Sequence, residues 1–200
     1  MKAIIGLGNP GASYRHSRHN AGFMAADAFV AARAGSGFKW KEWVRPEGKV
    51  AAECCRIDDA RRHEDSVLVA KPLTYMNRSG LAVEAILRDH EINLAALIVV
   101  CDDVHLDPGC LRIRPEGSSG GQKGLESIAA ALGTTGFARL RVGVGEPPKG
   151  SDLSDYVLGP PEPMEARRMQ EALKLTVEAL EVWAAEGVDA AMNRFNGLKN

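Results

Sequence analysis

The chain has 200 residues, of which 45% are hydrophobic and 26% charged, and its 25 Lys and Arg side chains nearly balance 26 Asp and Glu. This composition is typical of a globular protein, and a domain of this size can bury about 70% of the surface that its unfolded chain exposes. The net charge of −1 argues against a protein that coats nucleic acid through a uniformly basic surface. The charge is uneven, however, with 8 basic and 3 acidic residues in 1–50 against 5 and 9 in 151–200.

The spacing of the cysteines and the hydropathy of the sequence predict a protein of a reducing, aqueous compartment. Cys54, Cys55, Cys101 and Cys110 form no C-x-x-C pair and have no histidine at ligand spacing, so we expect reduced thiols in the core and no metal. The apolar run at the N-terminus is too short for a signal peptide, and no window approaches the roughly 18 apolar residues of a membrane span. We therefore expect a cytoplasmic protein without a membrane partner.

Short apolar runs alternate with helical patterns along the chain, which predicts a mixed α/β domain with helices packed on a sheet. Leu97 to Cys101 is the most apolar strand and is expected at the centre of the sheet. Asn20 is expected to cap the first helix, and no linker forces a domain boundary within 1–200. Strands are expected at 2–7, 38–44, 49–57, 66–71, 97–101, 110–114 and 139–144, and helices at 21–33, 80–90, 125–132 and from 164 onward.

Two glycine-rich segments match known motifs only in part. Gly6 to Gly11 fits the dinucleotide pattern G-x-G-x-x-G, but no helical pattern follows it and Asp27 falls inside a helix. Gly117 to Gly121 fits the nucleophile pattern G-x-S-x-G, but all five histidines precede Ser119, whereas that triad needs a later one. A nicotinamide cofactor site and a serine triad are both disfavoured.

Three polar segments can carry chemistry. A histidine near neutrality acts as a general base when a carboxylate orients it, and Asp102 and Asp103 directly follow the expected central strand, where α/β folds place their sites. Asn77 precedes a helix and is either its N-cap or an amide that binds a ligand. Residue types alone are also compatible with a solvent-exposed turn at Asp102 and Asp103, and with a histidine segment that is an ordinary polar surface. The histidine segment contains Tyr14, His16, Arg18, His19 and Asn20.

Taken together, these segments resemble the bacterial-type peptidyl-tRNA hydrolases. The similarity extends over nearly the whole chain in the family's order. It is carried by IIGLGNPGASYRHSRHNAG at 4–22, KPLTYMNRSG at 71–80, CDDVHLDPG at 101–109, GSSGGQKGLESI at 117–128, RLRVGVGEP at 139–147 and a DYVLG turn at 155–159.

The resemblance implies a monomeric, single-domain enzyme with a mixed, mostly parallel sheet flanked by helices, a three-layer sandwich. It implies hydrolysis of the ester between a peptide and the terminal ribose of tRNA, without cofactor or metal and without a DNA partner. His19 matches the family's catalytic base, and Asp102 matches the aspartate that orients it. Asn9 matches the asparagine that separates N-blocked from free aminoacyl groups.

The resemblance also implies contacts to the acceptor end of tRNA. Asn77 matches a second substrate-positioning asparagine, and Tyr14 and Tyr75 match aromatic positions near the acceptor end. Arg114 and Arg141 fall where the family carries basic residues for the terminal phosphate. With Arg18 and Lys123, these two arginines are expected to gather around the site.

One loop departs from the family pattern. The usual sequence is GGHNG, whereas residues 120–124 read GGQKG, with Gln122 and Lys123 in place of the histidine and asparagine. Lys123 cannot accept a hydrogen bond as asparagine does, although it can reach a phosphate or a ribose hydroxyl. A non-catalytic RNA-binding relative with the same groove is therefore the alternative to an enzyme.

Overall fold

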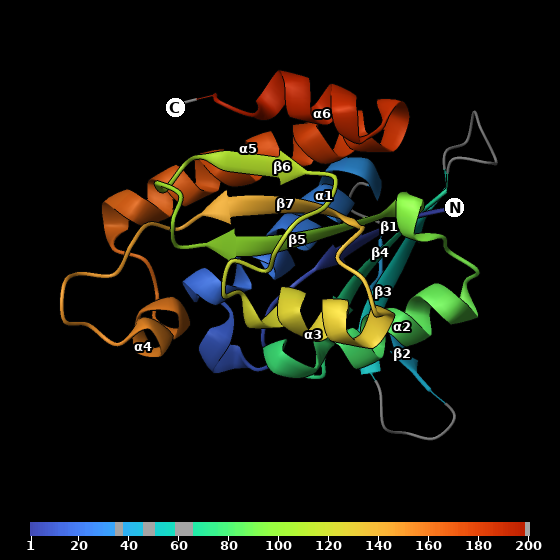
Figure 1. The fold of residues 1–200 in the computed structure, drawn as a ribbon, viewed down its shortest axis with the longest axis horizontal. Coiled ribbons are helices and arrows are strands. Elements are labelled where there is room, and N and C mark those ends of the chain that lie inside the picture. Colours follow the sequence, from blue (N-terminus) through green and yellow to red (C-terminus); the bar gives the residue numbers. More distant parts are fainter. Residues whose placement is uncertain (35–37, 46–50, 59–65, 199–200) are drawn as a thin grey trace.

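The fold is built on one seven-stranded sheet, seen in a computed structural model that describes residues 1–34, 38–45, 51–58 and 66–198. The strand order is β2-β3-β4-β1-β5-β7-β6 (Figure 1). The strands are β1 (Lys2–Gly6), β2 (Lys41–Val44), β3 (Ala51–Ile57), β4 (Val67–Pro72), β5 (Leu97–Asp103), β6 (Leu111–Arg114) and β7 (Ala138–Gly143).

The four central strands β4, β1, β5 and β7 run parallel, while β2, β3 and β6 are antiparallel to their neighbours. Every residue of β5 is buried, as expected for a strand that helices cover on both faces. The prediction that Leu97 to Cys101 forms an interior strand is confirmed, because β5 pairs with β1 on one side and β7 on the other. The carboxyl ends of β1, β4, β5 and β7 consequently meet at one edge of the sheet.

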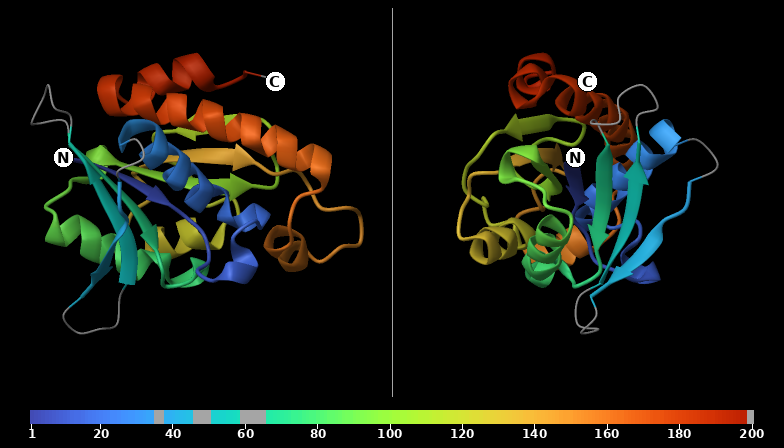
Figure 2. Two further views of the ribbon diagram at one scale, coloured as in Figure 1. Left: turned by 180° about the vertical axis from the view of Figure 1, so that it is seen from behind. Right: turned by 90° about the vertical axis from the view of Figure 1, so that its right-hand side faces the viewer.

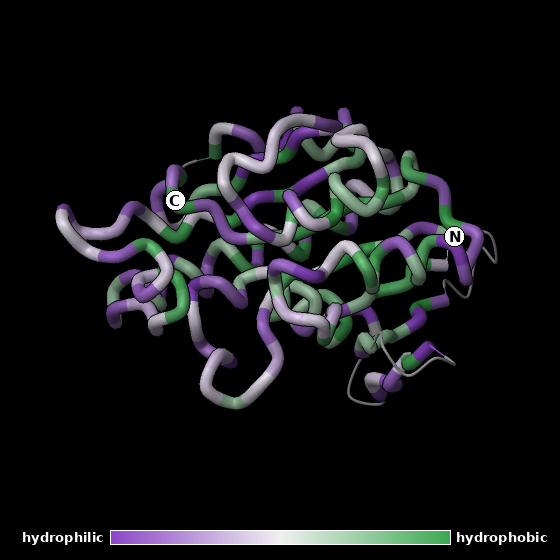
Figure 3. The backbone as a smooth tube through the Cα atoms, turned by 60° about the horizontal axis from the view of Figure 1, so that its bottom comes forward, coloured by the Kyte–Doolittle hydropathy of each residue, from purple (hydrophilic) through white to green (hydrophobic). Residues whose placement is uncertain are grey.

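Helices cover both faces and complete the three-layer sandwich (Figures 1 and 2). One face packs against α1 (Ala21–Ala34), α5 (Pro163–Glu186) and α6 (Val188–Phe195), around Phe29, Leu180 and Trp183. The other packs against α2 (Ser79–Asp89) and α3 (Lys123–Leu132). Hydrophobic segments run through the middle of the molecule, and hydrophilic ones prevail in the loops at its periphery (Figure 3).

Three local predictions need correction. The predicted closing helix is two helices, because the chain turns at Gly187 with φ of 94° between α5 and α6. Residues 155–159 are not simply a turn, since most of them belong to α4 (Leu153–Leu158), which Asp152 caps. Asn77 does not cap α2: it lies exposed in the 3-10 helix Met76–Arg78, and Arg78 precedes the first residue of α2. The predicted strand residues 49 and 50 lie outside the described residues.

Two glycines allow α1 to start against the end of β1. A Cβ atom on Gly6 would lie 2.2 Å from the carbonyl oxygen of Gly22, and one on Gly22 would lie 2.3 Å from Leu7 N and Val100 O. The same contact is fixed by a hydrogen bond of 3.1 Å from Phe23 N to Leu7 O. Gly6 of the G-x-G-x-x-G match therefore allows α1 to pack closely against β1. The helix α1 itself begins ten residues after Gly11.

We predict that Gly22→Ala costs more than about 3 kcal/mol of unfolding free energy, because its methyl group would overlap backbone atoms of Leu7, directly after β1, and of Val100 on β5, which cannot move independently. Urea unfolding measures the loss. Gly136→Ala is the matched control, since its Cβ would meet nothing closer than Thr134 Oγ1 at 3.3 Å in an exposed turn. Equal unfolding midpoints for the two variants would contradict the packing argument.

The four thiols are free, and they differ in burial. Cys54, Cys55 and Cys101 are buried, whereas Cys110 is half-buried. Burial raises the pKa of the Cys54 thiol to about 12, and it also raises the pKa of Cys55 and of Cys101, where the neighbouring Asp102 adds to the effect. The nucleophilic thiolate is thus disfavoured at all three buried positions.

We predict that an aromatic disulfide reagent at pH 8 modifies one thiol of the folded protein quickly, at Cys110, and the others only as fast as the fold opens. Absorbance of the released thiolate measures both phases. Cys110→Ser should remove the fast phase and keep the slow one. A fast phase that survives in this variant would show that a thiol assigned to the core is accessible.

Candidate active site

A cavity of about 670 Å³ lies at the edge of the sheet where the central strands end. Its polar wall combines the 3-10 helix Arg18–Asn20, the ends of β5 and β7 and the start of α3, and its apolar wall comes from the loops after β5 and β7 and from α4. The polar wall contains His19, Asp102, Gln122, Lys123 and Arg141. The apolar wall contains Val104, Pro147, Leu153 and Val157.

His19 and Asp102 form the central polar contact of this cavity. His19 Nδ1 lies 2.9 Å from Asp102 Oδ2, and the two side chains are 13% and 4% exposed. A carboxylate oxygen only accepts hydrogen bonds, so Nδ1 carries the proton and Nε2 is the nitrogen with a free lone pair. The pair thus presents an imidazole nitrogen that can accept a proton at the wall of an open cavity. The predicted proximity of these two residues, 83 positions apart in the chain, is observed.

The second oxygen of Asp102 is bound by Gln122, which the sequence did not single out as a partner of this carboxylate. Gln122 Nε2 donates to Asp102 Oδ1 over 3.0 Å, and Gln122 Oε1 accepts from Gly124 N and Leu125 N at the start of α3. The available signal was the position of Gln122 just before a helix, next to Gly124, whose missing side chain lets the helix approach Met76 and Leu7.

Asn9 is held on both its backbone and its side chain. Asn20 binds its backbone with two hydrogen bonds, accepting from Asn9 N over 2.8 Å and donating to Asn9 O over 3.0 Å. The predicted role of Asn20 as an N-cap of α1 is therefore wrong, because its amide serves the loop after β1. Asn9 Oδ1 accepts from Met76 N over 2.8 Å. The donor Nδ2 is then the end of the Asn9 amide that remains for a ligand.

The turn that presents Met76 N is strained. Tyr75 has φ of 60° and ψ of 156°, a conformation that non-glycine residues rarely adopt. Its side chain is 55% exposed, so no burial of the ring compensates for the strain. The observed consequence of this turn is the hydrogen bond from Met76 N to Asn9, which ties the strain to the orientation of a site residue.

Arg141 lines the cavity, as predicted, but its guanidinium is already engaged. It pairs with Asp103 over 3.1 Å and donates to Ser118 O and Ser119 O. The buried Arg139 beside it binds four carbonyl groups of the segments 117–118 and 135–137, and burial lowers its pKa. Both arginines therefore shape the loop before α3.

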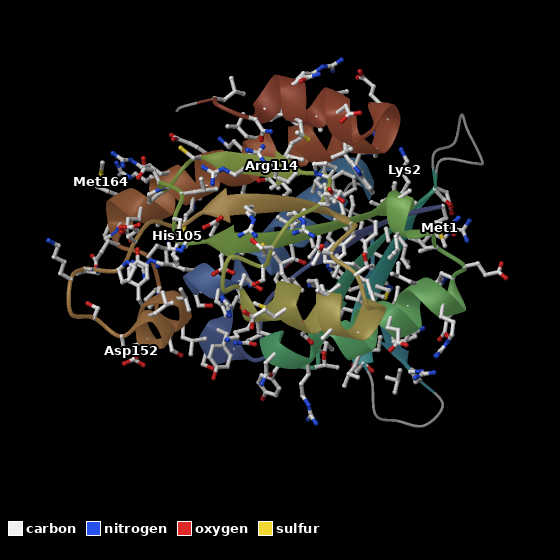
Figure 4. The ribbon with its side chains drawn as sticks, in the orientation of Figure 1. Met1, Lys2, His105, Arg114, Asp152 and Met164 are labelled. Atoms are coloured by element: carbon white, nitrogen blue, oxygen red, sulfur yellow. The ribbon has the colours of Figure 1, made fainter. Side chains whose placement is uncertain are left out.

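Arg114 and Arg18 do not line this cavity. Arg114 stands opposite Arg139 on the edge strand β6 and lines a second cavity of about 330 Å³. His105 lines both cavities, so the two are adjacent. In Figure 4, the label of His105 lies beside the ends of β5 and β7, and that of Arg114 lies farther along β6, away from these ends. Arg18 is 5% exposed, pairs with Glu165 over 2.5 Å and stacks on Tyr156, fixing α4 and α5. Of the four basic residues expected near the site, Lys123 and Arg141 line the cavity itself, whereas Arg18 and Arg114 line neighbouring cavities that share residues with it.

The remaining predicted residues are exposed or half-buried. Lys123 is exposed at the start of α3 and pairs with Glu126 over 3.1 Å. Tyr14 is half-buried and Asn77 is exposed, each on a short 3-10 helix. Within the described ranges, no group of three or more His, Cys, Asp or Glu side chains is arranged to hold a metal ion. None of the described helices has the length and apolar character needed to cross a membrane.

The comparisons with known proteins point to one family. A family model described as peptidyl-tRNA hydrolase matches residues 3–200. The chain is 44% identical over 199 residues to a peptidyl-tRNA hydrolase of Desulforudis audaxviator, covering 100% of this chain and 95% of that protein. It is 42% identical to the one from Rhodopirellula baltica, over 98% and 97% of the two chains. The crystal structure of the Acinetobacter baumannii peptidyl-tRNA hydrolase superposes with a TM-score of 0.85 at 30% identity, covering 100% and 96%.

The similarity to these enzymes spans the full length of the chain, the single α/β domain has the same topology, and its cavity is built around a histidine and a carboxylate. The chain therefore belongs to the peptidyl-tRNA hydrolase family.

Proposed function

We propose that this protein hydrolyses the ester bond between a peptide, or an N-blocked aminoacyl group, and the terminal ribose of tRNA, with His19 as the general base. The observation that carries the proposal is the 2.9 Å contact of His19 Nδ1 with Asp102 at the wall of the cavity. Recycling of peptidyl-tRNA released from ribosomes would place the protein in the cytoplasm.

In the proposed reaction, His19 Nε2 takes a proton from a water molecule while the water oxygen attacks the ester carbonyl carbon. Asp102 stabilises the imidazolium that forms and keeps the ring in its reactive orientation. When the tetrahedral intermediate collapses, the imidazolium returns the proton to the departing ribose oxygen, leaving a peptide carboxylic acid and a free tRNA hydroxyl. The base itself contributes about 10² to 10⁴ in rate.

Asn9 is the proposed determinant for blocked over free aminoacyl groups. Because Asn9 Oδ1 is engaged by Met76 N, Nδ2 is available as a donor for a carbonyl oxygen. A peptidyl or N-acyl group presents such an oxygen next to the ester, whereas a free aminoacyl group presents an ammonium that only donates. A site that binds the acceptor loses that hydrogen bond with the ammonium compound.

The tRNA would extend from the cavity of His19 over neighbouring surfaces. Lys123 and Arg141 line the cavity itself, and Tyr14, Tyr75 and Asn77 are proposed to contact the acceptor end, as the family resemblance implies. Arg114 lies in the adjacent hollow that shares His105, where a terminal phosphate could reach it while the ester lies at His19. We expect the protein to act as a monomer.

The altered loop does not favour the non-catalytic alternative. Gln122 supports Asp102 from the side opposite His19, so the base and its carboxylate are intact. Lys123 replaces an acceptor by a cation, which changes how this loop meets the substrate and leaves the water-activating pair unchanged.

We predict that His19→Ala lowers kcat by about 10² to 10⁴ and changes KM little, because the imidazole acts on the water and makes few contacts in the ground state. Asp102→Asn should lower kcat by a similar factor, since an amide can stabilise the wrong tautomer of the ring. Release of peptide from N-acetylaminoacyl-tRNA measures both. An alanine variant with the wild-type rate would refute the assignment of the base.

We predict that Arg114→Ala raises KM severalfold, leaves kcat unchanged and reduces the salt dependence of KM by about one released counterion. Kinetics at several KCl concentrations measure this change. Arg56→Ala is the matched control, because Arg56 is exposed on β3 near the end of the sheet opposite the cavity. If both variants behave as wild type, the phosphate contact at Arg114 is wrong.

A further inference from the structure

We infer that Gln122 is a positioning residue of the hydrolytic site, which holds the carboxylate of Asp102 by its second oxygen and thereby sets the basicity and orientation of His19. The inference rests on the proposed function of the His19–Asp102 pair. It concerns a residue at which this chain departs from the family's usual loop.

The orientation of the Gln122 amide is fixed by its surroundings. Oε1 accepts from Gly124 N over 2.6 Å and from Leu125 N over 3.0 Å, and both of these groups can only donate. The oxygen must therefore face the helix, and the NH2 group must face the other way. Nε2 lies there 3.0 Å from Asp102 Oδ1 and 3.3 Å from Met76 Sδ.

The contact is buried, which strengthens its electrostatic effect. Gln122 is 8% exposed and Asp102 is 3% exposed, so little water competes for Oδ1. With Nδ1 of His19 on Oδ2, the carboxylate is held at both oxygens, and rotation about its terminal torsion is blocked. The negatively charged Asp102 carboxylate thus interacts with the neutral amide of Gln122 at one oxygen and with His19 at the other.

The amide also links this carboxylate to the position of α3. Because the same side chain caps α3 and binds Asp102, a shift of the helix start moves the carboxylate. Gly124 is required for the close approach, since a Cβ there would lie 2.6 Å from Met76 Sδ and 2.9 Å from Gln122 Oε1.

Other charged groups of the cavity are engaged with partners of their own. Asp103 pairs with Arg141 over 3.1 Å, Lys123 pairs with Glu126 over 3.1 Å, and His105 lies 3.6 Å from Glu146. Members of these pairs line the cavity from β5, β7, α3 and the loops after β5 and β7, and Asp152, which also lines it, accepts from Asp155 N at the start of α4. The neutral donor on the far oxygen of Asp102 is therefore the group whose removal changes the carboxylate most directly.

The test compares Gln122→Met with Ser127→Ala. Methionine keeps the size of the side chain and removes both the donor to Asp102 and the cap of α3. Ser127→Ala weakens α3 elsewhere, since Ser127 Oγ accepts from Gly80 N on α2, and it leaves Asp102 untouched. Imidazole ¹⁵N shifts of the free enzyme, assigned with His19→Ala, give the titration midpoint of His19 without any substrate.

We expect Gln122→Met to raise the His19 midpoint, because the carboxylate charge then acts on the imidazolium alone. We expect kcat on N-acetylaminoacyl-tRNA to fall about tenfold with KM within about twofold, because the carboxylate can rotate. Ser127→Ala should change neither quantity. Gln122→His, which restores a ring N–H at this position, should recover most of kcat.

An unchanged or lowered His19 midpoint in Gln122→Met would overturn the inference, and so would an equal shift in Ser127→Ala. If Gln122→Met does not fold, Gln122→Asn is measured in the same way, since the shorter amide cannot span both Asp102 and the helix, and the same rise is expected. A wild-type protein that releases no peptide would refute the proposed function, while the titration would still decide the role of Gln122.

Discussion

The hydrogen bond between His19 and Asp102 is the contact on which the site depends, and the sheet topology makes it possible. Asp102 is near the end of β5, while His19 belongs to the segment that follows the neighbouring parallel strand β1. Parallel strands bring their carboxyl ends to one edge, and the Gly6–Gly22 contact lets the chain return to that edge at the start of α1. A bulkier residue at either glycine would displace the segment that carries His19, so core packing and base geometry are constrained together.

The residues around this bond form a closed set of contacts. Asn20 binds the backbone of Asn9, Asn9 Oδ1 binds Met76 N, Met76 Sδ lies against Gln122, and Gln122 binds Asp102, whose other oxygen binds His19. His19 is adjacent to Asn20 in sequence, which closes the set. The loop after β1, the turn before α2, the start of α3 and the end of β5 are thereby held relative to one another. Preorganisation of this kind limits the motion of His19, as the proposed role of this residue as a base requires.

The strands, their approximate limits and the central place of Leu97 to Cys101 could be predicted from the sequence, because buried parallel strands are continuous apolar runs. The pairing of His19 with Asp102 followed only from resemblance, since spacing does not reveal which loop faces which strand end. The role of Arg18 could not be predicted, because its guanidinium is satisfied by Glu165 and by backbone carbonyls near α4, all distant in sequence. The predictions that Asn20 and Asn77 cap helices are wrong for the same reason. Both residues have a high propensity for capping and precede a helix, but in each case the backbone enters a 3-10 turn before the helix begins.

The near-zero net charge of the chain has a local counterpart at the cavity. Arg141 is offset by Asp103 and Lys123 by Glu126, so the cationic groups that line the cavity are already paired. A phosphate that approaches must compete with these carboxylates, which limits the free energy of binding at the site. Each additional unpaired cation would release a further counterion and strengthen binding to substrate and product alike. Equal stabilisation of substrate and transition state does not raise kcat, and tighter binding of the product slows its release. The pairing of these cations therefore suits an enzyme that must release its tRNA. In this proposal, exposed cations outside the cavity, such as Arg114, supply the remaining attraction at a distance from the reacting end.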